Sequence, residues 1–473
     1  MRLFLIWPSD KETATYLFTG LKQAGHEVVY WTGLKKNDSG FPGVIAHDHF
    51  DAWAGIPPPE LAEMSFNPPE EELINKMSGA ESTIMTMMNK HFQGMSVDER
   101  KNFYYNSLAY WYGVLNKFKP AAVLFSAFPH PIHSYLVYEL ARLLNIKTLM
   151  FDVTSVANRT VWCEDFRQGS RRLEEKIEKN RGVNFSVADL SPDIQLYLKR
   201  YSPDNNDATP EYFKKDLAKG NLKNKIILLT ILFFKSFTDF SVLKKTAVYL
   251  KKIFKNNIQK EYRRVHNPQP DLSKKFIYAP LHYQPEANTS PTGGIFVSQI
   301  LMIRVLAAAL PAGWLLYVKE HPGQWLAYGL NYTDYRYPGY YRQIAGFNNV
   351  QLISVKSNSF DLINKSQAVA VVSGTAGWEA ILRGKSALVF GFPWYRMCPG
   401  AWPIQGVKSC RQALEKITGG YSPDSQSAIN FLKNFELSSV RGYGEEGNQG
   451  EMKLSRQEYF ASLVKVINDE LKK

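Results

Sequence analysis

The stretch YVKEHP at residues 317–322, followed by VSGTAGWEA at 372–380, decides the fold expected of this chain. Each stretch begins at the end of an apolar run that is typical of a buried strand. The runs are at 314–318 and 368–372, and polar residues follow each of them directly. In an open α/β sheet, ligands bind just outside the carboxyl ends of parallel strands. The spacing fits one strand–helix–strand passage, so we expect the two polar clusters to meet at one crevice.

The second cluster has the chemistry of an anion cradle. Ser373, Gly374 and Thr375 offer hydroxyls, an unhindered backbone and free amides before a helix expected at 377–383. The helix dipole favours negative charge there. An ordinary N-cap with Glu379 packed nearby is the alternative interpretation.

A third polar cluster lies upstream, after a short strand at 276–278 and before a helix expected at 296–310. Gln284, Glu286 and Asn288 place hydrogen-bonding groups where the ribose or base of a nucleotide would lie. The alternative is an ordinary loop between a strand and a helix.

Three short motifs follow one another in this half of the chain: Gln284 with Pro285, His321 with Pro322, and Ser373 with Thr375. In this order they resemble the motifs of bacterial capsule and lipopolysaccharide glycosyltransferases of the GT-B fold. The resemblance is to β-Kdo transferases and some bacterial sialyltransferases, which use CMP-activated acidic sugars. It covers residues 276–393, whereas the amino-terminal half is similar only in general architecture.

The resemblance implies a division of labour at the donor. His321 would touch the donor phosphate or assist the departure of the nucleotide, and Ser373 and Thr375 would bind phosphate oxygens. The Gln284 loop and Glu379 would hold cytidine or ribose. The complete expected donor set is Gln284, Pro285, Glu286, Lys319, His321, Pro322, Ser373, Gly374, Thr375 and Glu379.

Oriented donors and a helix N-terminus can stabilise a departing phosphate without a metal. No Asp-x-Asp motif stands at a strand end, so we expect metal-independent chemistry with no cofactor besides the nucleotide-sugar substrate. Lys319 either neutralises phosphate or pairs with a carboxylate.

The amino-terminal half has the pattern of a second α/β unit. Apolar runs at 2–7, 26–31, 121–125 and 148–153 predict strands, and residues 13–24 have helical spacing. A Gly-x-Gly-x-x-Gly fingerprint is missing, which argues against a dinucleotide cofactor in this half.

Polar residues at these strand ends are candidates for catalysis and acceptor binding. Glu164 and Asp165 are the first candidates for a catalytic carboxylate, and Asp152 is the second. A solvated acidic pair and a turn cap are the competing interpretations. For acceptor binding we expect His130, His133 and Arg159; metal ligation by the histidines lacks a third ligand.

The chain of 473 residues, with 45% hydrophobic residues, is long enough for two cores. We expect an acceptor domain at 1–200, a basic and apolar helical insertion or linker at 201–270, a nucleotide-sugar domain at 271–440, and a loop and helix at 441–473 that return to the first domain. Three cysteines, no signal peptide pattern and no long apolar span predict a cytoplasmic protein.

The positive charge is concentrated at 214–264. This stretch contains fourteen basic and three acidic residues and supplies most of the formal net charge of +13. The stretch either lies on the inner membrane surface, or is a linker with solvated lysines. Nucleic-acid binding is less well supported than either, because no recognised fold or stacking platform accompanies the charge.

The sequence thus predicts an α/β GT-B-like glycosyltransferase of surface polysaccharide assembly. The expected donor is CMP-Kdo or a related CMP-ulosonic acid, and the acceptor a glycan or a lipid-linked glycan. Two alternatives stay open: a UDP-sugar transferase or sugar-nucleotide epimerase using the same crevice, and a non-catalytic scaffold of capsule assembly or export.

Overall fold

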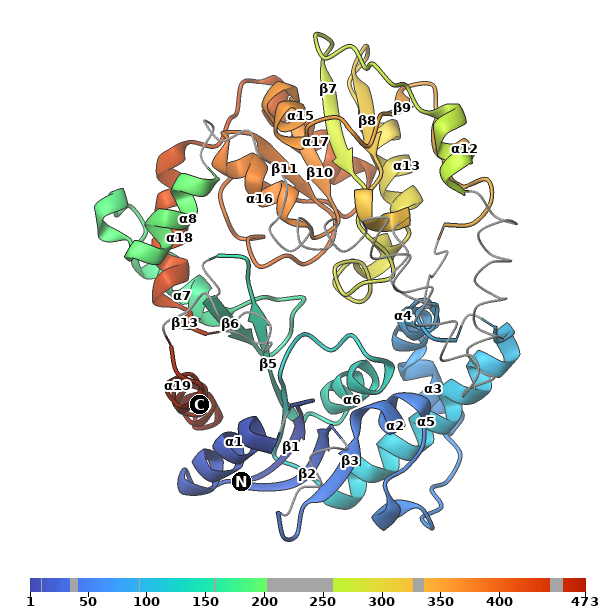
Figure 1. Cartoon of the computed structure of the whole chain (residues 1–473), viewed down its shortest axis with the longest axis vertical. Coiled ribbons are helices and arrows are strands. Elements are labelled where there is room, and N and C mark those ends of the chain that lie inside the picture. Colours follow the sequence, from blue (N-terminus) through green and yellow to red (C-terminus); the bar gives the residue numbers. More distant parts are fainter. Residues whose placement is uncertain are drawn as a thin grey trace, which may run out of the picture.

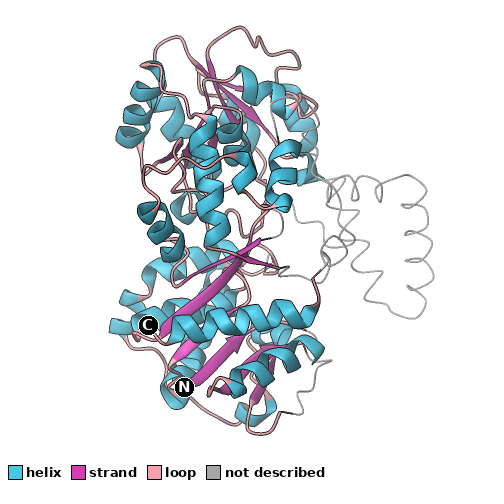
Figure 2. Cartoon of the chain, turned by 90° about the vertical axis from the view of Figure 1, so that its left-hand side faces the viewer, coloured by secondary structure: helices cyan, strands magenta, loops and turns pink. Residues whose placement is uncertain are grey.

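The computed structural model contains two α/β domains, one above the other (Figures 1 and 2). It describes residues 1–9, 11–34, 41–92, 94–156, 159–201, 258–325, 336–442 and 454–473. Most of the basic stretch 214–264 lies outside these residues. Among the helices that the structure does describe, none has the length and apolar character needed to cross a bilayer.

The first domain is built on a seven-stranded sheet of order β13-β6-β5-β4-β1-β2-β3. Strands β1 to β5 pair in parallel, whereas β6 and β13 pair antiparallel at one edge. The strands are β1 Arg2–Ile6, β2 Glu27–Gly33, β3 Ile45–Asp48, β4 Ala122–Phe125, β5 Lys147–Val153, β6 Arg159–Cys163 and β13 Val440–Arg441.

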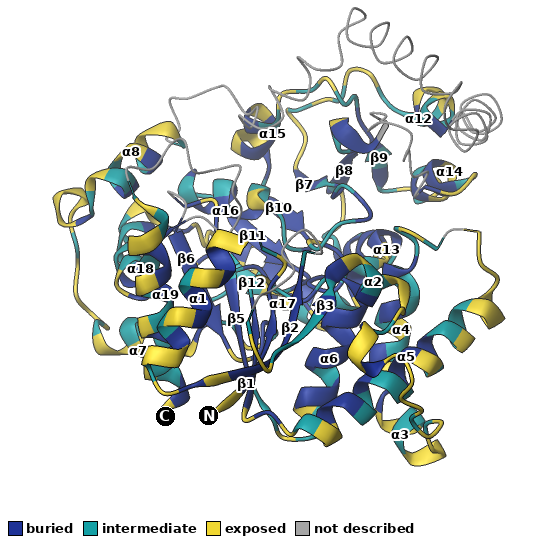
Figure 3. Cartoon of the chain, turned by 60° about the horizontal axis from the view of Figure 1, so that its bottom comes forward, coloured by how far each residue is buried: buried dark blue, intermediate teal, exposed yellow. Residues whose placement is uncertain are grey.

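Helices cover both faces of this sheet. The helices of the first domain are α1 Lys11–Gln23, α2 His49–Ala54, α3 Glu71–Lys76, α4 Ser78–Met87, α5 Val97–Phe118 and α6 Ile132–Leu143, with the short η2 Pro59–Leu61. Helix α1 buries Ala14, Leu17 and Leu21, which recur at helical spacing on one face. The strands are buried and the outward helix faces are exposed (Figure 3).

The second domain has a six-stranded, all-parallel sheet of order β12-β11-β10-β7-β8-β9. Its central strands are apolar without alternation because helices cover both faces. The strands are β7 Phe276–Pro280, β8 Leu315–Lys319, β9 Val350–Leu352, β10 Ala368–Val371, β11 Ser386–Val389 and β12 Ala401–Pro403. The helices are α12 Ile258–Val265, η4 Gly294–Val297, α13 Gln299–Ala309, η5 Pro322–Trp325, α14 Tyr340–Ala345, α15 Ser359–Lys365, α16 Thr375–Leu382, α17 Val407–Thr418 and α18 Ser425–Leu437.

Two segments cross between the domains. Helices α7 (Arg171–Lys179) and α8 (Pro192–Arg200), joined through η3 (Val187–Asp189), pack beside α18 in the core of the second domain, although the sequence places residues up to 200 with the first (Figure 1). Helix α19 (Arg456–Leu471) crosses back and packs on α1.

The amino-terminal sheet and the carboxyl-terminal sheet each have the doubly wound arrangement, and side chains of the two domains meet directly. Phe166 packs against Phe392 with ring centroids 5.9 Å apart, and the hydroxyls of Thr86 and Ser290 lie 2.8 Å apart. Two facing Rossmann-like domains with a final helix returning to the first are the GT-B architecture. The fold class expected from the sequence is therefore confirmed.

Candidate functional site

The three polar clusters of the second domain follow adjacent strands. β7 lies between β10 and β8, and all three run in parallel, so their carboxyl ends share one edge of the sheet. Three segments leave the sheet at this edge: the loop after β7, the turn after β8 and the start of α16. They form the candidate site, at the position where open α/β sheets bind ligands.

His282 joins two of these strand ends. Its Nε2 accepts hydrogen bonds from the backbone amides of Ser373, at 3.2 Å, and Gly374, at 2.8 Å. Burial, together with nearby His321 and Arg336, lowers the pKa of His282 to about 3, so its ring is neutral and can accept both bonds. A side chain at position 374 would place Cβ 2.7 Å from Nε2, which explains the glycine.

Fewer groups near Ser373 are available to bind an anion than the sequence suggests. The hydroxyl of Ser373 donates to the carbonyl oxygen of Asn288 at 2.5 Å and lies 3.2 Å from the hydroxyl of Thr292, so it joins two loops. Because the amides of Ser373 and Gly374 are bonded to His282, an anion at this helix end would have to use the next first-turn amides of α16, at Thr375 and Ala376. Thr375 is exposed.

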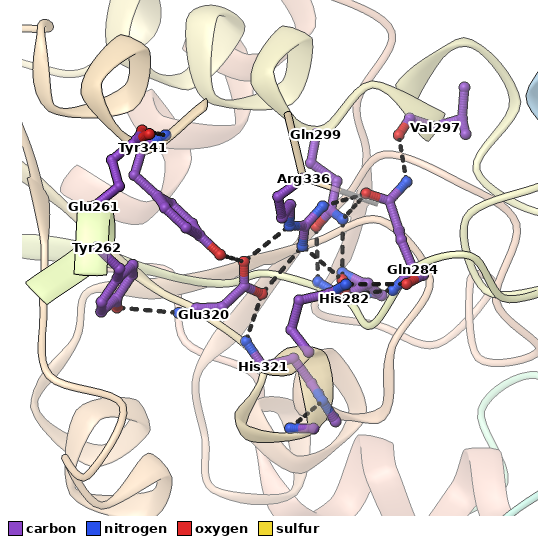
Figure 4. Close-up of polar contacts among 12 residues, drawn as sticks. Glu261, Tyr262, His282, Gln284, Val297, Gln299, Glu320, His321, Arg336 and Tyr341 are labelled. Carbon is purple, nitrogen blue, oxygen red and sulfur yellow. Dashed lines mark hydrogen bonds and ion pairs between the residues drawn. The ribbon is translucent and has the colours of Figure 1, made fainter. Parts of the chain in front are cut away.

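The side chain of Gln284 points into the protein (Figure 4). Its Nε2 donates to the carbonyl oxygen of Val297 at 2.9 Å, and its Oε1 accepts from Gln299 at 2.9 Å and from Arg336. These described contacts give Gln284 the role of holding the loop after β7 in shape. The sequence suggested contact with cytidine or ribose instead.

Glu320, at the end of β8, is the centre of a buried network (Figure 4). Its carboxylate accepts from the guanidinium of Arg336 at 2.9 and 3.0 Å, from the hydroxyl of Tyr341 at 2.6 Å and from the amide of His321 at 2.7 Å. Glu320 is 0% exposed and Arg336 1% exposed. A buried carboxylate needs such a set of partners, and the network fixes the backbone that carries His321.

His321 stands at the strand end where the sequence predicts a phosphate contact. Its Nδ1 accepts the amide of Gly323 at 3.1 Å, which leaves the proton of the neutral ring on Nε2. Burial lowers the pKa of His321 below its usual value, with Arg336 and Lys319 acting in the same direction and Glu320 opposing them. A neutral ring with an Nε2–H donor suits a phosphate oxygen.

Lys319, the last residue of β8, and Glu379, in α16, influence each other electrostatically beside this edge. The ammonium of Lys319 donates to the carbonyl oxygen of Ser357 at 3.0 Å and to the hydroxyl of Ser359 at 2.5 Å. Burial lowers the pKa of Lys319 to about 8, although Glu379 opposes the shift. Burial likewise raises the pKa of Glu379 to about 7, against the influence of Arg383, Thr375 and Lys319. Perturbed groups of this kind cluster at functional sites.

Of the remaining residues of the expected donor set, Pro285 is buried, Glu286 is half-buried and Pro322 is exposed. Glu286 follows Pro285 and forms an ion pair of 3.5 Å with Lys90 of the first domain, with both side chains partly exposed. Pro322 begins η5 directly after His321. Glu286 therefore joins the loop after β7 to the first domain.

In the first domain, Asp152 lies near the carboxyl end of β5, which reaches toward the second domain (Figure 1). No side chain among the described residues hydrogen-bonds to its carboxyl group, which is half-buried. Burial raises the pKa of Asp152 to about 6. A carboxylate with this pKa is suited to accept a proton near neutral pH.

Glu164 and Asp165, the first candidates from sequence, lie elsewhere because β6 runs antiparallel to β5 and carries the chain back. Glu164 is 61% exposed and pairs with Lys147, the first residue of β5, at 3.5 Å. Asp165 accepts from the hydroxyl of Tyr138 at 2.7 Å and pairs with Arg142 at 3.4 Å. These positions lend no support to a catalytic role for either residue.

Of the expected acceptor residues, His130 follows β4 and is half-buried, and His133 lies in the first turn of α6 with 1% exposure. Arg159 is held by Asp193 at 3.0 Å and by the hydroxyl of Ser191 at 2.8 Å, so its guanidinium fastens α8 to β6. No group of three potential metal ligands occurs within the described ranges.

Sequence reasoning gave no site role to His282, Gln299 or Gln324. His282 stood inside the third polar cluster, so its position at a strand end was a usable signal. Gln324 exchanges two hydrogen bonds of 3.0 Å with the backbone of Gln284, and no local pattern indicates that pairing.

A protein-family model matches a part of the chain that overlaps the candidate site. Residues 286–402 match the family model described as "Capsule polysaccharide biosynthesis protein". The matched segment contains β8, His321, β10 and the start of α16. The second domain thus resembles the capsule polysaccharide biosynthesis family over the part that carries the site.

Matches among solved structures include KpsC of Thermosulfurimonas dismutans, a beta Kdo 2,7 transferase, at 13% identity over 81% of this chain and 96% of that chain, with a TM-score of 0.29. The UDP-GlcNAc 2-epimerase of Methanocaldococcus jannaschii is 11% identical over 92% and 100% of the two chains, with a TM-score of 0.25. A glycosyltransferase of Rickettsia africae ESF-5 is 10% identical over 100% and 98%, with a TM-score of 0.28. No curated protein sequence matches the chain.

Proposed function

We propose that this chain is a glycosyltransferase of bacterial capsule polysaccharide biosynthesis. It transfers a sugar from a nucleotide donor, a CMP-linked ulosonic acid such as Kdo, to a glycan or glycolipid acceptor. The observation that carries the proposal is the overlap between the capsule biosynthesis match at 286–402 and the strand ends that carry His321 and α16.

The proposed chemistry uses groups that follow strands of both domains. As the bond between the sugar and the phosphate oxygen breaks, negative charge grows on the departing CMP. The Nε2–H of His321 and the amides of Thr375 and Ala376 stabilise this charge. The carboxylate of Asp152 takes the proton of the acceptor hydroxyl while the oxygen of that hydroxyl forms a bond to the anomeric carbon of the donor sugar. The proposed reaction uses no metal and no resident cofactor.

The proposed location is the cytoplasmic face of the inner membrane. The excess of basic residues at 214–264 supports it, because lysines are attracted to anionic lipid. Co-sedimentation with vesicles of anionic lipid, and failure to sediment with neutral vesicles, is the expected result.

The test of the donor is a thermal-shift titration with CMP, UDP, GDP and buffer. CMP at a hundred times its dissociation constant is expected to add about 2.7 kcal/mol to the stability. His321→Ala weakens this effect, whereas the matched control His266→Ala, at the end of α12, leaves it intact. A preference for UDP would move the donor to a UDP-sugar, with a transferase or an epimerase as the activity; no response to any nucleotide would favour a scaffold.

A further inference from the structure

A basic pocket lies between α12 and α14, at the edge of the second domain that ends in β9 (Figures 1 and 3). Its volume is about 350 Å³, and its lining consists of Lys260, Glu261, Arg264, Val265 and Arg342. This volume falls at the lower end of the range of small-ligand sites. We call this site the α12–α14 pocket.

Glu261 holds the two helices together and gives the α12–α14 pocket its shape. Its carboxylate accepts the backbone amides of Gly339 at 2.8 Å, Tyr341 at 3.0 Å and Arg342 at 3.1 Å (Figure 4). Arg264 follows Glu261 by about one helical turn on α12 and lines the same pocket as Arg342. Backbone hydrogen bonds thus bring two guanidinium groups from different helices to one place.

The cations of the α12–α14 pocket are not neutralised by the protein around them. Lys260, Arg264 and Arg342 are exposed, and within the described part of the chain neither guanidinium has a carboxylate partner. Glu261 is the only carboxylate among the lining residues, and backbone amides already surround it. The pocket therefore has a net positive charge and suits an anion from outside the chain.

The chemistry of these side chains selects a phosphate. A guanidinium is a planar fork that matches two phosphate oxygens, and an ammonium adds a compact charge. Phospholipid headgroups present phosphates at a surface, where each basic residue strengthens binding about fivefold.

The surroundings of the α12–α14 pocket favour a lipid surface over a dissolved phosphate ester. Helix α12 is the described end of the basic stretch 214–264, and it buries Ile258 and Tyr262 while its basic residues face outward. Tyr337, just before α14, is 52% exposed. Aromatic rings with a polar tip are enriched at the boundary between membrane and water.

We infer that the α12–α14 pocket binds the phosphate of an anionic phospholipid and docks the second domain on the inner membrane surface. This inference rests on the proposed location at the membrane and deepens it by naming the contact site. Because β9 pairs with β8, docking at this edge brings the strand that leads to His321 close to the bilayer. A lipid-linked acceptor is held at that same surface.

Sedimentation of the full chain with vesicles tests the inference. The probes are vesicles of equal parts phosphatidylglycerol and phosphatidylcholine, with pure phosphatidylcholine as the neutral comparison. Lys260→Ser/Arg264→Ser/Arg342→Ser is expected to weaken binding to the anionic vesicles about a hundredfold, because three charges of about fivefold each are lost. Arg264→Lys/Arg342→Lys keeps the charge but loses the forked contacts, and is expected to weaken binding about fivefold.

The matched control is Lys274→Ser/Lys275→Ser/Lys416→Ser, which removes the same charge from exposed positions of the second domain. It is expected to weaken binding less than about threefold, because charges more than a Debye length from the lipid are screened. An equal loss in this control, or no loss in the arginine-to-lysine variant, would replace the pocket by diffuse attraction and overturn the inference.

Two further outcomes would also overturn it. One is equal sedimentation of the wild-type chain with both kinds of vesicle, and the other is binding of sn-glycerol 3-phosphate as tightly, per phosphate, as the anionic vesicles. A chain that sediments with anionic vesicles as well after the triple substitution as before it keeps the proposed location and loses the pocket. The thermal shift by CMP, measured on the same samples, decides the proposed donor site separately.

Discussion

The imidazole of His282 accepts the backbone amide of Gly374 at 2.8 Å, so a side chain from the end of β7 caps the start of α16. The same nitrogen accepts the amide of Ser373. This contact fixes the N-terminus of α16 against the loop after β7 before any ligand binds. A preorganised helix end is what transition-state charge stabilisation requires.

Replacing His282 is expected to loosen that helix end. His282→Ala leaves the amides of Ser373 and Gly374 without an acceptor, which costs about 1–3 kcal/mol in the free energy of unfolding and weakens CMP binding. His282→Gln places an amide oxygen near the position of Nε2 and retains much of both properties. Denaturant unfolding and CMP titration of the two variants measure this. Equal losses in both would show that the acceptor atom at this position is unimportant.

The buried pair of Arg336 and Glu320 is expected to dominate local stability. Arg336→Met leaves a fully buried carboxylate without its cation, at a cost of about 3–5 kcal/mol in the free energy of unfolding. Adding Glu320→Gln removes the stranded charge and restores part of the loss. Arg342→Met, at an exposed position on α14, is the control and changes stability by less than about 0.5 kcal/mol. A small effect of Arg336→Met in denaturant unfolding would contradict the prediction.

The ammonium of Lys319 is expected to give CMP binding a pH dependence. With a pKa of about 8 in the free protein, Lys319 is charged below pH 8 and loses its proton as the pH rises through that value. Binding an anion favours the charged form, so CMP affinity falls above pH 8, by up to about tenfold per pH unit. Calorimetric titration between pH 6.5 and 9.5 measures the slope.

Lys319→Met is expected to flatten that pH dependence. Lys385→Met, a half-buried lysine after α16 whose pKa burial also lowers, is expected to preserve it. An unchanged slope in Lys319→Met would assign the pH dependence to another group.

Ionisation of Asp152 is expected to determine how kcat/KM falls at acidic pH. It accepts a proton only when ionised, so kcat/KM rises with pH up to about its pKa of 6 and then levels off. Asp152→Asn lowers kcat by roughly 10²- to 10⁴-fold, with the CMP thermal shift unchanged.

The control for Asp152 is Glu164→Gln, which changes an exposed carboxylate paired with Lys147 and leaves kcat within about twofold. The reverse pattern, with Glu164→Gln inactive and Asp152→Asn active, would return the catalytic role to the loop after β6.

Much of the site is visible in the sequence because its residues follow buried strands. The apolar runs before His321 and Ser373 predict parallel strands, and the fold confirms the shared edge of the sheet. The sequence does not reveal in which direction a side chain at that edge points. Gln284 and His321 both follow strands and look equally available in sequence, yet Gln284 turns inward to Arg336, from a segment far along the chain.

The sequence by itself determined the two α/β domains and the order of the polar clusters, since burial and periodicity are recorded locally along each strand and helix. Only the tertiary structure decided which polar groups are already occupied. Arg142 pairs with Asp165, Asp193 holds Arg159, and His282 caps α16, whereas Asp152 keeps a carboxyl group without a described partner. The physical reason is that hydrogen bonds and ion pairs are completed by distant segments, whose approach depends on how helices and sheets pack.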